Sequence, residues 1–141
     1  MPNDHELLQG FWKLTSCTLN GQLHPHPDSG SIFQFSGNRF RHLRSRVSYR
    51  FVVYPNISPK GIDIILPSTK ALAPGIYELN GDRLQVMQAS WRGIRPLSFD
   101  DPQYRLDVYT RFRRNVSVKR RTRSQVPETA FPGSLVPKGL L

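Results

Sequence analysis

Histidine and carboxylate side chains near the amino terminus are the residues whose spacing comes nearest to a metal site. A proline-rich loop places His24 and His26 two residues apart, with Asp28 close behind. Alternate histidines can chelate a metal ion, but a zinc site takes three or four protein ligands. His5 and His42 would join this set only if the fold happened to bring them to the loop. We therefore interpret the loop as solvated and predict no metal and no cofactor.

Acid–base or nucleophilic catalysis is the second chemistry to consider. Asp100 and Asp101 are adjacent carboxylates followed by Pro102, which is typical of a turn, and adjacent side chains on such a turn point apart. Cys17 has no base near it in sequence, so a buried thiol is expected. The chain has no nucleophile elbow, no phosphate-binding glycine-rich loop and no His-Glu metalloprotease motif. We predict no catalytic residue, and an enzyme is kept only as the weaker alternative.

Arginines are concentrated in a way that suits binding of a polyanion. The predicted polyanion-binding residues are Arg39, Arg41, Arg44, Arg46, Arg50, Lys119, Arg120, Arg121 and Arg123. Phe40, Tyr49 and Phe51 lie among the first five, and arginines beside aromatic rings can hold phosphates and stack bases. Nucleic acid or another polyanion, bound through residues 39–50 and the basic cluster 111–123, is therefore one alternative function.

The sidedness of the first five arginines decides whether they form one surface. On a regular strand, Arg39 and Arg41 face one side while Arg44, Arg46 and Arg50 face the other, because side chains alternate. A bulge near Leu43 would bring them to the same side. Both arrangements stay open from the sequence.

The net charge of +10 is placed mostly at the carboxyl end. Residues 1–110 carry 12 Lys or Arg and 9 Asp or Glu, whereas residues 111–141 carry 8 Lys or Arg and one Glu. The segment 115–141 also has three prolines, two glycines and little periodicity, so we interpret it as an irregular basic tail. A tail of this kind suits a protein partner on which it folds.

Apolar alternation and turn dipeptides predict an all-β chain. The turns are Asn20-Gly21, Gly37-Asn38 and Asn80-Gly81-Asp82, which suit tight hairpins. Strands are expected at 11–19, 31–36, 39–47, 48–54, 62–66, 76–79, 83–89, 91–99 and 104–114. In the first of these, Trp12, Leu14 and Ser16 share one face. The one helical segment expected is a turn at 4–10, with Asp4 as its cap.

These strands predict a small antiparallel up-and-down barrel of about eight strands over residues 1–114, followed by the tail 115–141. Closure removes the exposed sheet edges that an open sheet would present.

The single cysteine excludes a disulfide within the chain. No apolar run approaches the roughly 20 residues of a membrane span, and residues 1–10 lack the pattern of a secretory signal. We therefore expect no membrane span and a cytoplasmic protein.

A barrel of this size can hold one small molecule in its mouth. The predicted ligand-binding residues are Trp12, Phe33, Phe35, Phe40, Tyr49, Phe51, Tyr77 and Trp91. The alternative is that these aromatic rings fill the barrel and leave no cavity. The leading prediction is a non-enzymatic binding module, with a small apolar or amphipathic ligand in the barrel or a protein partner held by the tail and the arginines. An enzyme with its site at the barrel mouth is the weakest alternative.

Gly10-x-Trp12 at the start of the first strand resembles the lipocalin signature. That resemblance implies that the tryptophan closes one end of the barrel, under an arginine of the last strand supplied by Arg111 or Arg113. A guanidinium on indole contributes up to about 2 kcal/mol when it is desolvated.

A second resemblance covers residues 7–114. The chain is similar to a lipocalin-like domain family of uncharacterised, mainly planctomycete bacterial proteins, through the segments LLQGFWKLTS, IFQFSGNRF, SPKGIDI, GIYELNGDRLQV, RPLSF and YTRFRR. Members of that family often carry a leader, which we do not expect in this chain, and the basic extension after Arg114 is not part of the family pattern. Because the family has no established activity, the resemblance implies a fold and not a reaction.

Overall fold

Antiparallel strands dominate the computed structural model, which describes residues 2–24 and 30–113. One short helix, α1 (Asp4–Leu8), precedes them. The strands are β1 (Gly10–Leu19), β2 (Gln22–His24), β3 (Ile32–Ser36), β4 (Arg39–His42), β5 (Tyr49–Tyr54), β6 (Lys60–Ile65), β7 (Leu72–Asn80), β8 (Arg83–Gln88) and β9 (Arg105–Phe112).

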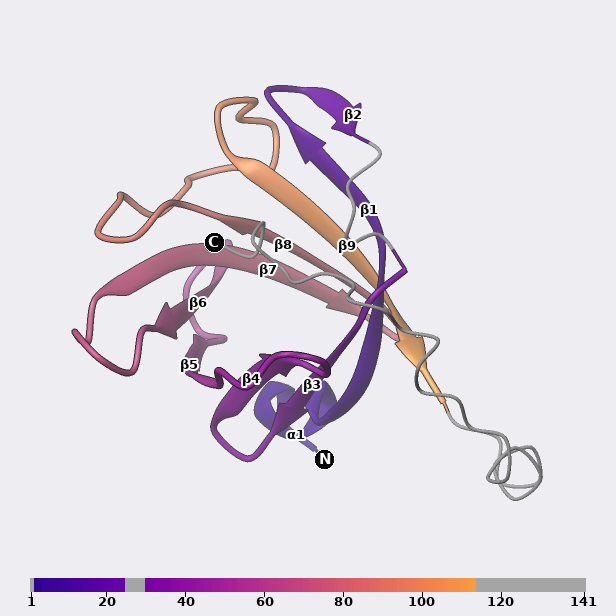
Figure 1. Ribbon diagram of the computed structural model, residues 1–141. Helices are drawn as coiled ribbons and strands as arrows, with labels where there is room; N and C mark the ends of the chain where they lie inside the picture. The colour runs from indigo at the N-terminus through magenta and orange to yellow at the C-terminus, as the bar shows by residue number, and fades with distance from the viewer. Residues whose placement is uncertain (1, 25–29, 114–141) are drawn as a thin grey trace, which may run out of the picture.

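The strands form a closed barrel. Neighbours follow the order β2-β1-β3-β4-β5-β6-β7-β8-β9, and β1 also pairs with β9, so eight strands make a ring that β2 extends as a hairpin on β1. Figure 1 shows these strands curving around a common interior. The predicted all-β class and the antiparallel up-and-down barrel of about eight strands are confirmed.

The strand predicted at 91–99 is wrong. This segment is a loop between β8 and β9, and Arg95 holds it against the outside of the barrel. The Arg95 guanidinium donates to the carbonyl of Gly75 at 2.9 Å, lies 2.9 Å from an Asp63 carboxylate oxygen and covers the Tyr54 ring. These partners lie on β5, β6 and β7, so the Arg95 side chain fastens the loop to three strands, and the loop itself is not part of the sheet.

The predicted helical turn is present, but its cap differs from the expected one. Asn3, not Asp4, caps α1 in a reciprocal capping box with Glu6. Asp4 is the first helical residue, and its carboxylate accepts hydrogen bonds from Tyr77 at 2.6 Å and Lys60 at 2.9 Å. The helix is thereby tied to β6 and β7 at one end of the barrel.

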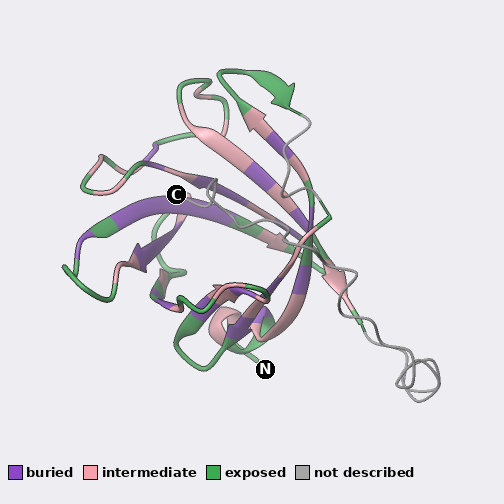
Figure 2. Ribbon diagram, viewed as in Figure 1, coloured by how far each residue is buried: buried purple, intermediate pink, exposed green. Residues whose placement is uncertain are grey.

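A bulge in β1 changes which of its side chains face the interior. The register against β9 shifts between Leu14 and Ser16, because one extra residue stands on the bulged strand. As a result Trp12, Leu14 and Cys17 are buried, and the predicted inward position of Ser16 is wrong. Figure 2 shows buried residues recurring along most of the strands of the ring, while β2 is exposed.

Among the described residues, no helix has the length and apolar character needed to cross a membrane. The predicted tail 115–141, with Lys119, Arg120, Arg121 and Arg123, lies outside the described residues. His26 and Asp28, which were considered as metal ligands and for which no metal was predicted, lie outside them as well.

Candidate ligand cavity and the end that closes it

One end of the barrel is closed by Trp12 under Arg111. The indole is fully buried, and its Nε1 donates to the carbonyl of Leu8 at 2.9 Å. Arg111, directly opposite Trp12 in the register, places its guanidinium carbon 4.2 Å from the indole centre. The same guanidinium donates to the carbonyls of Leu7 at 2.7 Å and Gln9 at 3.2 Å. The first strand β1, the last strand β9 and the helix α1 are thus joined at one point.

The backbone at Gly10 makes this junction possible. Its φ is +118°, a conformation that side chains rarely adopt, and a Cβ there would stand 3.6 Å from an Arg111 nitrogen. The structure places Arg111 rather than Arg113 over the indole. Arg113 instead forms an exposed ion pair of 2.8 Å with Asp82, which also accepts from Arg111.

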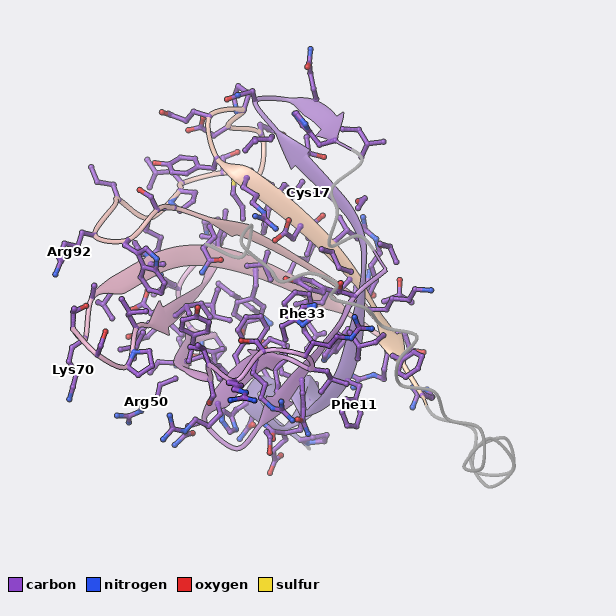
Figure 3. The ribbon with its side chains drawn as sticks, viewed as in Figure 1. Phe11, Cys17, Phe33, Arg50, Lys70 and Arg92 are labelled. Atoms are coloured by element: carbon purple, nitrogen blue, oxygen red, sulfur yellow. The ribbon has the colours of Figure 1, made fainter. Side chains whose placement is uncertain are left out.

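Aromatic rings fill the barrel above this junction. Phe35 packs edge-on against Phe51 with ring centres 5.0 Å apart, and Phe33 stacks on Phe40 at 5.5 Å. His5 from α1 stacks on the other side of Phe51 at 5.3 Å. Figure 3 shows Phe33 inside the ring of strands. This half of the barrel has no room for a ligand, because the rings contact one another directly.

The opposite half of the barrel holds a cavity of about 840 Å³ that opens to solvent. Its aromatic lining is Phe40, Tyr49, Trp91, Tyr104 and Tyr109. Its aliphatic lining includes Leu19, Ile64, Ala73, Ala89 and Ile94. Polar or charged lining residues include His24, Gln88, Gln103, Arg105 and Asp107. Pockets that bind small molecules measure about 300–1,000 Å³, so this cavity has the size of a ligand site.

The cavity exists because inward side chains become smaller along the same strands. On β1, buried Trp12 near the closed end is followed by Cys17 near the open end. On β7, buried Tyr77 near the closed end corresponds to Ala73 near the open end. Phe40 and Tyr49 from neighbouring strands form the floor where the two halves meet.

One side of the cavity carries an ion pair between two residues of β9. The Arg105 Nε donates to both carboxylate oxygens of Asp107, at 2.9 and 3.2 Å. Burial lowers the pKa of Arg105, but the charge and hydrogen bond of Asp107 outweigh burial and raise it overall. Arg105 therefore stays charged at neutral pH. Buried charges are tolerated when they are paired in this way, and they give the wall a polar strip.

Cys17 on β1 lines the cavity beside Asp107, its register partner on the neighbouring strand β9. Burial and the neighbouring carboxylate raise the pKa of its thiol to about 11, so the thiolate that would act as a nucleophile is scarce at neutral pH.

Among residues 2–24 and 30–113, no three His, Cys, Asp or Glu side chains gather where a metal ion could be held. Asp101 accepts from the backbone and side chain of Gln103, as a turn-forming aspartate does.

The predicted ligand-binding residues divide between the two halves. Phe40, Tyr49 and Trp91 line the cavity, and the rings of Tyr49 and Trp91 lie 5.9 Å apart at its mouth. The other predicted residues pack in the core away from the cavity lining, namely Trp12, Phe33, Phe35, Phe51 and Tyr77. Sequence reasoning missed Cys17, Ala73, Arg105 and Asp107. The signal was present, since a small residue on a buried face leaves space and a charged one needs a partner.

The arginines of residues 39–50 lie on the outside of the barrel, away from this cavity. β4 ends at His42, so a turn, not a continuous strand, carries Arg44 and Arg46. Of the two arrangements left open, regular alternation, which would put Arg50 on the opposite side from Arg39, is wrong, because Arg50 pairs directly with Arg39 and both are exposed. Phe40 and Tyr49 point inward, and the arginines beside them point outward, so the barrel wall does not divide the arginine set.

Comparison of the chain with protein-family models, with curated proteins and with solved structures finds no match. The resemblance to the lipocalin-like domain family stays a prediction from sequence motifs.

Proposed function

We propose that the barrel is a binding module for one small amphipathic molecule, held in the cavity at its open end. The observation that carries this proposal is the cavity itself, about 840 Å³ of space in a barrel whose other half is tightly filled. Protein interiors are normally packed without voids of this size, so an open pocket with a defined floor is typical of a ligand site.

The cavity lining has an apolar part and a charged part, which together favour an amphipathic ligand over a wholly apolar one. Phe40, Tyr49 and Trp91 offer ring faces, which suit an aromatic or short aliphatic body. Arg105 and Asp107 offer a charged strip on β9. A wholly apolar ligand would cover this strip without hydrogen bonding to it, which costs free energy. A ligand with a hydroxyl, amide or similar head group would avoid that cost.

The floor of the cavity limits the length of the ligand. Phe33 stacks on Phe40 beneath the floor, and Trp12 closes the barrel beyond it. A long hydrocarbon chain therefore has no path through the barrel. A compact molecule of one or two rings, with its polar group toward β9, fits the space best.

A dye titration tests the proposal. The amphipathic dye 8-anilinonaphthalene-1-sulfonate should bind in the cavity with enhanced fluorescence, and nearly equally at 0.1 and 1 M salt, because apolar contact is only weakly screened. Ala73→Phe, which adds a ring to the wall, should weaken binding about tenfold or more, the loss expected when a well-filled site is obstructed. Val52→Phe adds the same ring on the outer face of β5 and is the matched control.

Equal dye affinity in the two variants would contradict the proposal. Thermal melts of both variants establish that the barrel is intact, since dyes of this kind also bind loosened proteins. Native mass spectrometry of protein purified from its own host complements the titration. A small bound mass that persists in high salt would identify the natural ligand.

A further inference from the structure

Arginines form a cationic surface on the outer face of β3, β4 and β5 that is separate from the ligand cavity. Arg39 and Arg41 point outward because the residues that alternate with them on β4, Phe40 and His42, are buried. Arg50 points outward on β5 for the same reason, and Figure 3 shows it at the outside of the barrel. The turn after β4 adds Arg46 to this side. Arg39, Arg41, Arg46 and Arg50 thus lie on one side of the barrel.

The register of the sheet places two of these charges directly against each other. Arg39 on β4 is opposite Arg50 on β5, and Ser36 on β3 completes the row. Like charges directly opposite in antiparallel strands destabilise the sheet. Among the described residues, no carboxylate forms an ion pair with Arg39, Arg41, Arg46 or Arg50. The repulsion is therefore left uncompensated within this part of the chain, and an external anion would relieve it.

An open groove runs between these side chains. Its lining includes Ser36, Arg39, Arg41, Ser45, Arg46 and Ser48, and its volume is about 670 Å³. We call it the arginine groove. Guanidinium groups and hydroxyls all offer hydrogen-bond donors, and the planar guanidinium fork matches the oxygens of a phosphate. None of the residues that line the groove is acidic. Its chemistry thus suits phosphate groups.

The direction of the aromatic rings decides which part of a nucleic acid the groove can contact. Stacking of unpaired bases needs exposed rings, but Phe40, Tyr49 and Phe51 all point into the barrel. What remains on the surface is a set of donors for the sugar–phosphate backbone, which a duplex presents without exposing its bases. The open shape of the groove suits a polymer that passes across it, and the net charge of +10 favours such a partner.

We propose that the arginine groove binds the phosphate backbone of double-stranded nucleic acid without reading its sequence. The arginine groove is separate from the barrel cavity, so the proposal for one can be disproved while the proposal for the other stands. In the dye titration, only the part of binding that Ala73→Phe weakens and Val52→Phe leaves unchanged reports on the cavity, because the sulfonate of the dye is also a ligand for guanidinium groups.

The test is fluorescence anisotropy of a labelled 20-base-pair DNA duplex, titrated with the full chain at several salt concentrations. Arg39→Gln with Arg41→Gln should weaken binding about tenfold and reduce the slope of log affinity against log salt by about two, one for each lost phosphate contact. The control is Lys13→Gln with Arg83→Gln, which removes the same charge from exposed positions on β1 and β8, where both face Thr110 of β9. The control pair should leave the slope nearly unchanged.

Equal losses in the two pairs would overturn the site and leave only general charge attraction. Tighter binding of the same oligonucleotide as a single strand would overturn the assignment to a duplex backbone. Binding to phosphatidylglycerol vesicles but not to the duplex would assign the groove to a lipid surface instead, and so would also overturn the proposal. Thermal melts of both pairs check that each remains folded, which is expected because the four side chains are exposed or half-buried.

Discussion

The two ends of the barrel use aromatic side chains in opposite ways. At the closed end, Trp12 has a hydrogen-bond partner for its N–H and a guanidinium over its face, so both the polar and the apolar parts of the side chain are satisfied by the protein. At the open end, Trp91 is half-buried and meets Tyr49 at the rim of the cavity. The first arrangement stabilises the fold, whereas the second leaves ring faces for another molecule.

This difference shows how a small barrel can carry both a core and a pocket. Strands long enough to close the ring pass through both halves, so residue size along each strand decides which half is filled. Tyr77 and Ala73 on β7 illustrate the change within four residues. If this division is correct, substitutions at the closed end will reduce stability, and those at the open end will mainly reduce binding.

The largest effect is expected for Trp12→Ala. Removal of a fully buried aromatic side chain should lower the free energy of unfolding by about 3–5 kcal/mol, because apolar contact is lost and a cavity remains. Urea denaturation followed by circular dichroism measures the change. A loss below about 1 kcal/mol would show that the indole is not the closing element.

The next effect is expected for Arg111→Lys. Lysine keeps the charge but cannot reach the carbonyls of Leu7 and Gln9 together while it covers the indole, so stability should fall by about 2 kcal/mol. Arg113→Lys is the control, because Arg113 is 68% exposed and should contribute almost nothing. Comparable losses for the two arginines would remove the special role of Arg111.

A smaller, pH-dependent effect is expected at Asp4. Burial raises the pKa of this carboxyl, but hydrogen bonds from Tyr77 and Lys60 outweigh burial and hold the pKa below 3.8. A lowered pKa contributes stability above the unfolded value, which is lost as the pH falls through the folded value. Asp4→Asn should therefore cost about 1 kcal/mol at pH 6.5 and much less at pH 2.5. Urea midpoints at the two pH values measure this, and an equal cost at both would contradict it.

Local patterns predicted the ring of strands well. Strand alternation and the turn residues at 20–21, 37–38 and 80–82 depend on neighbours in sequence, and the hairpins form there, with the third turn at Gly81-Asp82. The helical turn was also predicted, but its cap was placed one residue late, at Asp4. The pairing of Asn3 with Glu6 three residues later is a local signal for the cap that the prediction overlooked. The contacts of Asp4 with Lys60 and Tyr77, which are distant in sequence, could not be read from the neighbours of Asp4.

The candidate site was harder to predict because its features depend on contacts between distant segments. The bulge that turns Cys17 inward arises in the pairing of β1 with β9. The loop at 91–99 alternates like a strand, but Arg95 finds its partners on β6 and β7. Large aromatic residues were predicted to contact a ligand, yet several of them fill the core. The space was made instead by small residues such as Ala73, whose effect appears only when the facing side chains are known.

The smallest effect on stability, and the sharpest test of the comparison, is expected for Trp91→Ala. Trp91 is half-buried on the loop after β8, and its ring contact with Tyr49 is tilted at 5.9 Å. Its removal should lower the free energy of unfolding by about 1 kcal/mol or less, the range for one aromatic pair near the surface. Dye affinity should nevertheless fall about fivefold, because one ring face of the cavity is lost. Measured beside Trp12→Ala, the variant separates the two ends. A stability loss near that of Trp12→Ala would show that the rim is part of the core, and the division between a filled half and a binding half would then be wrong.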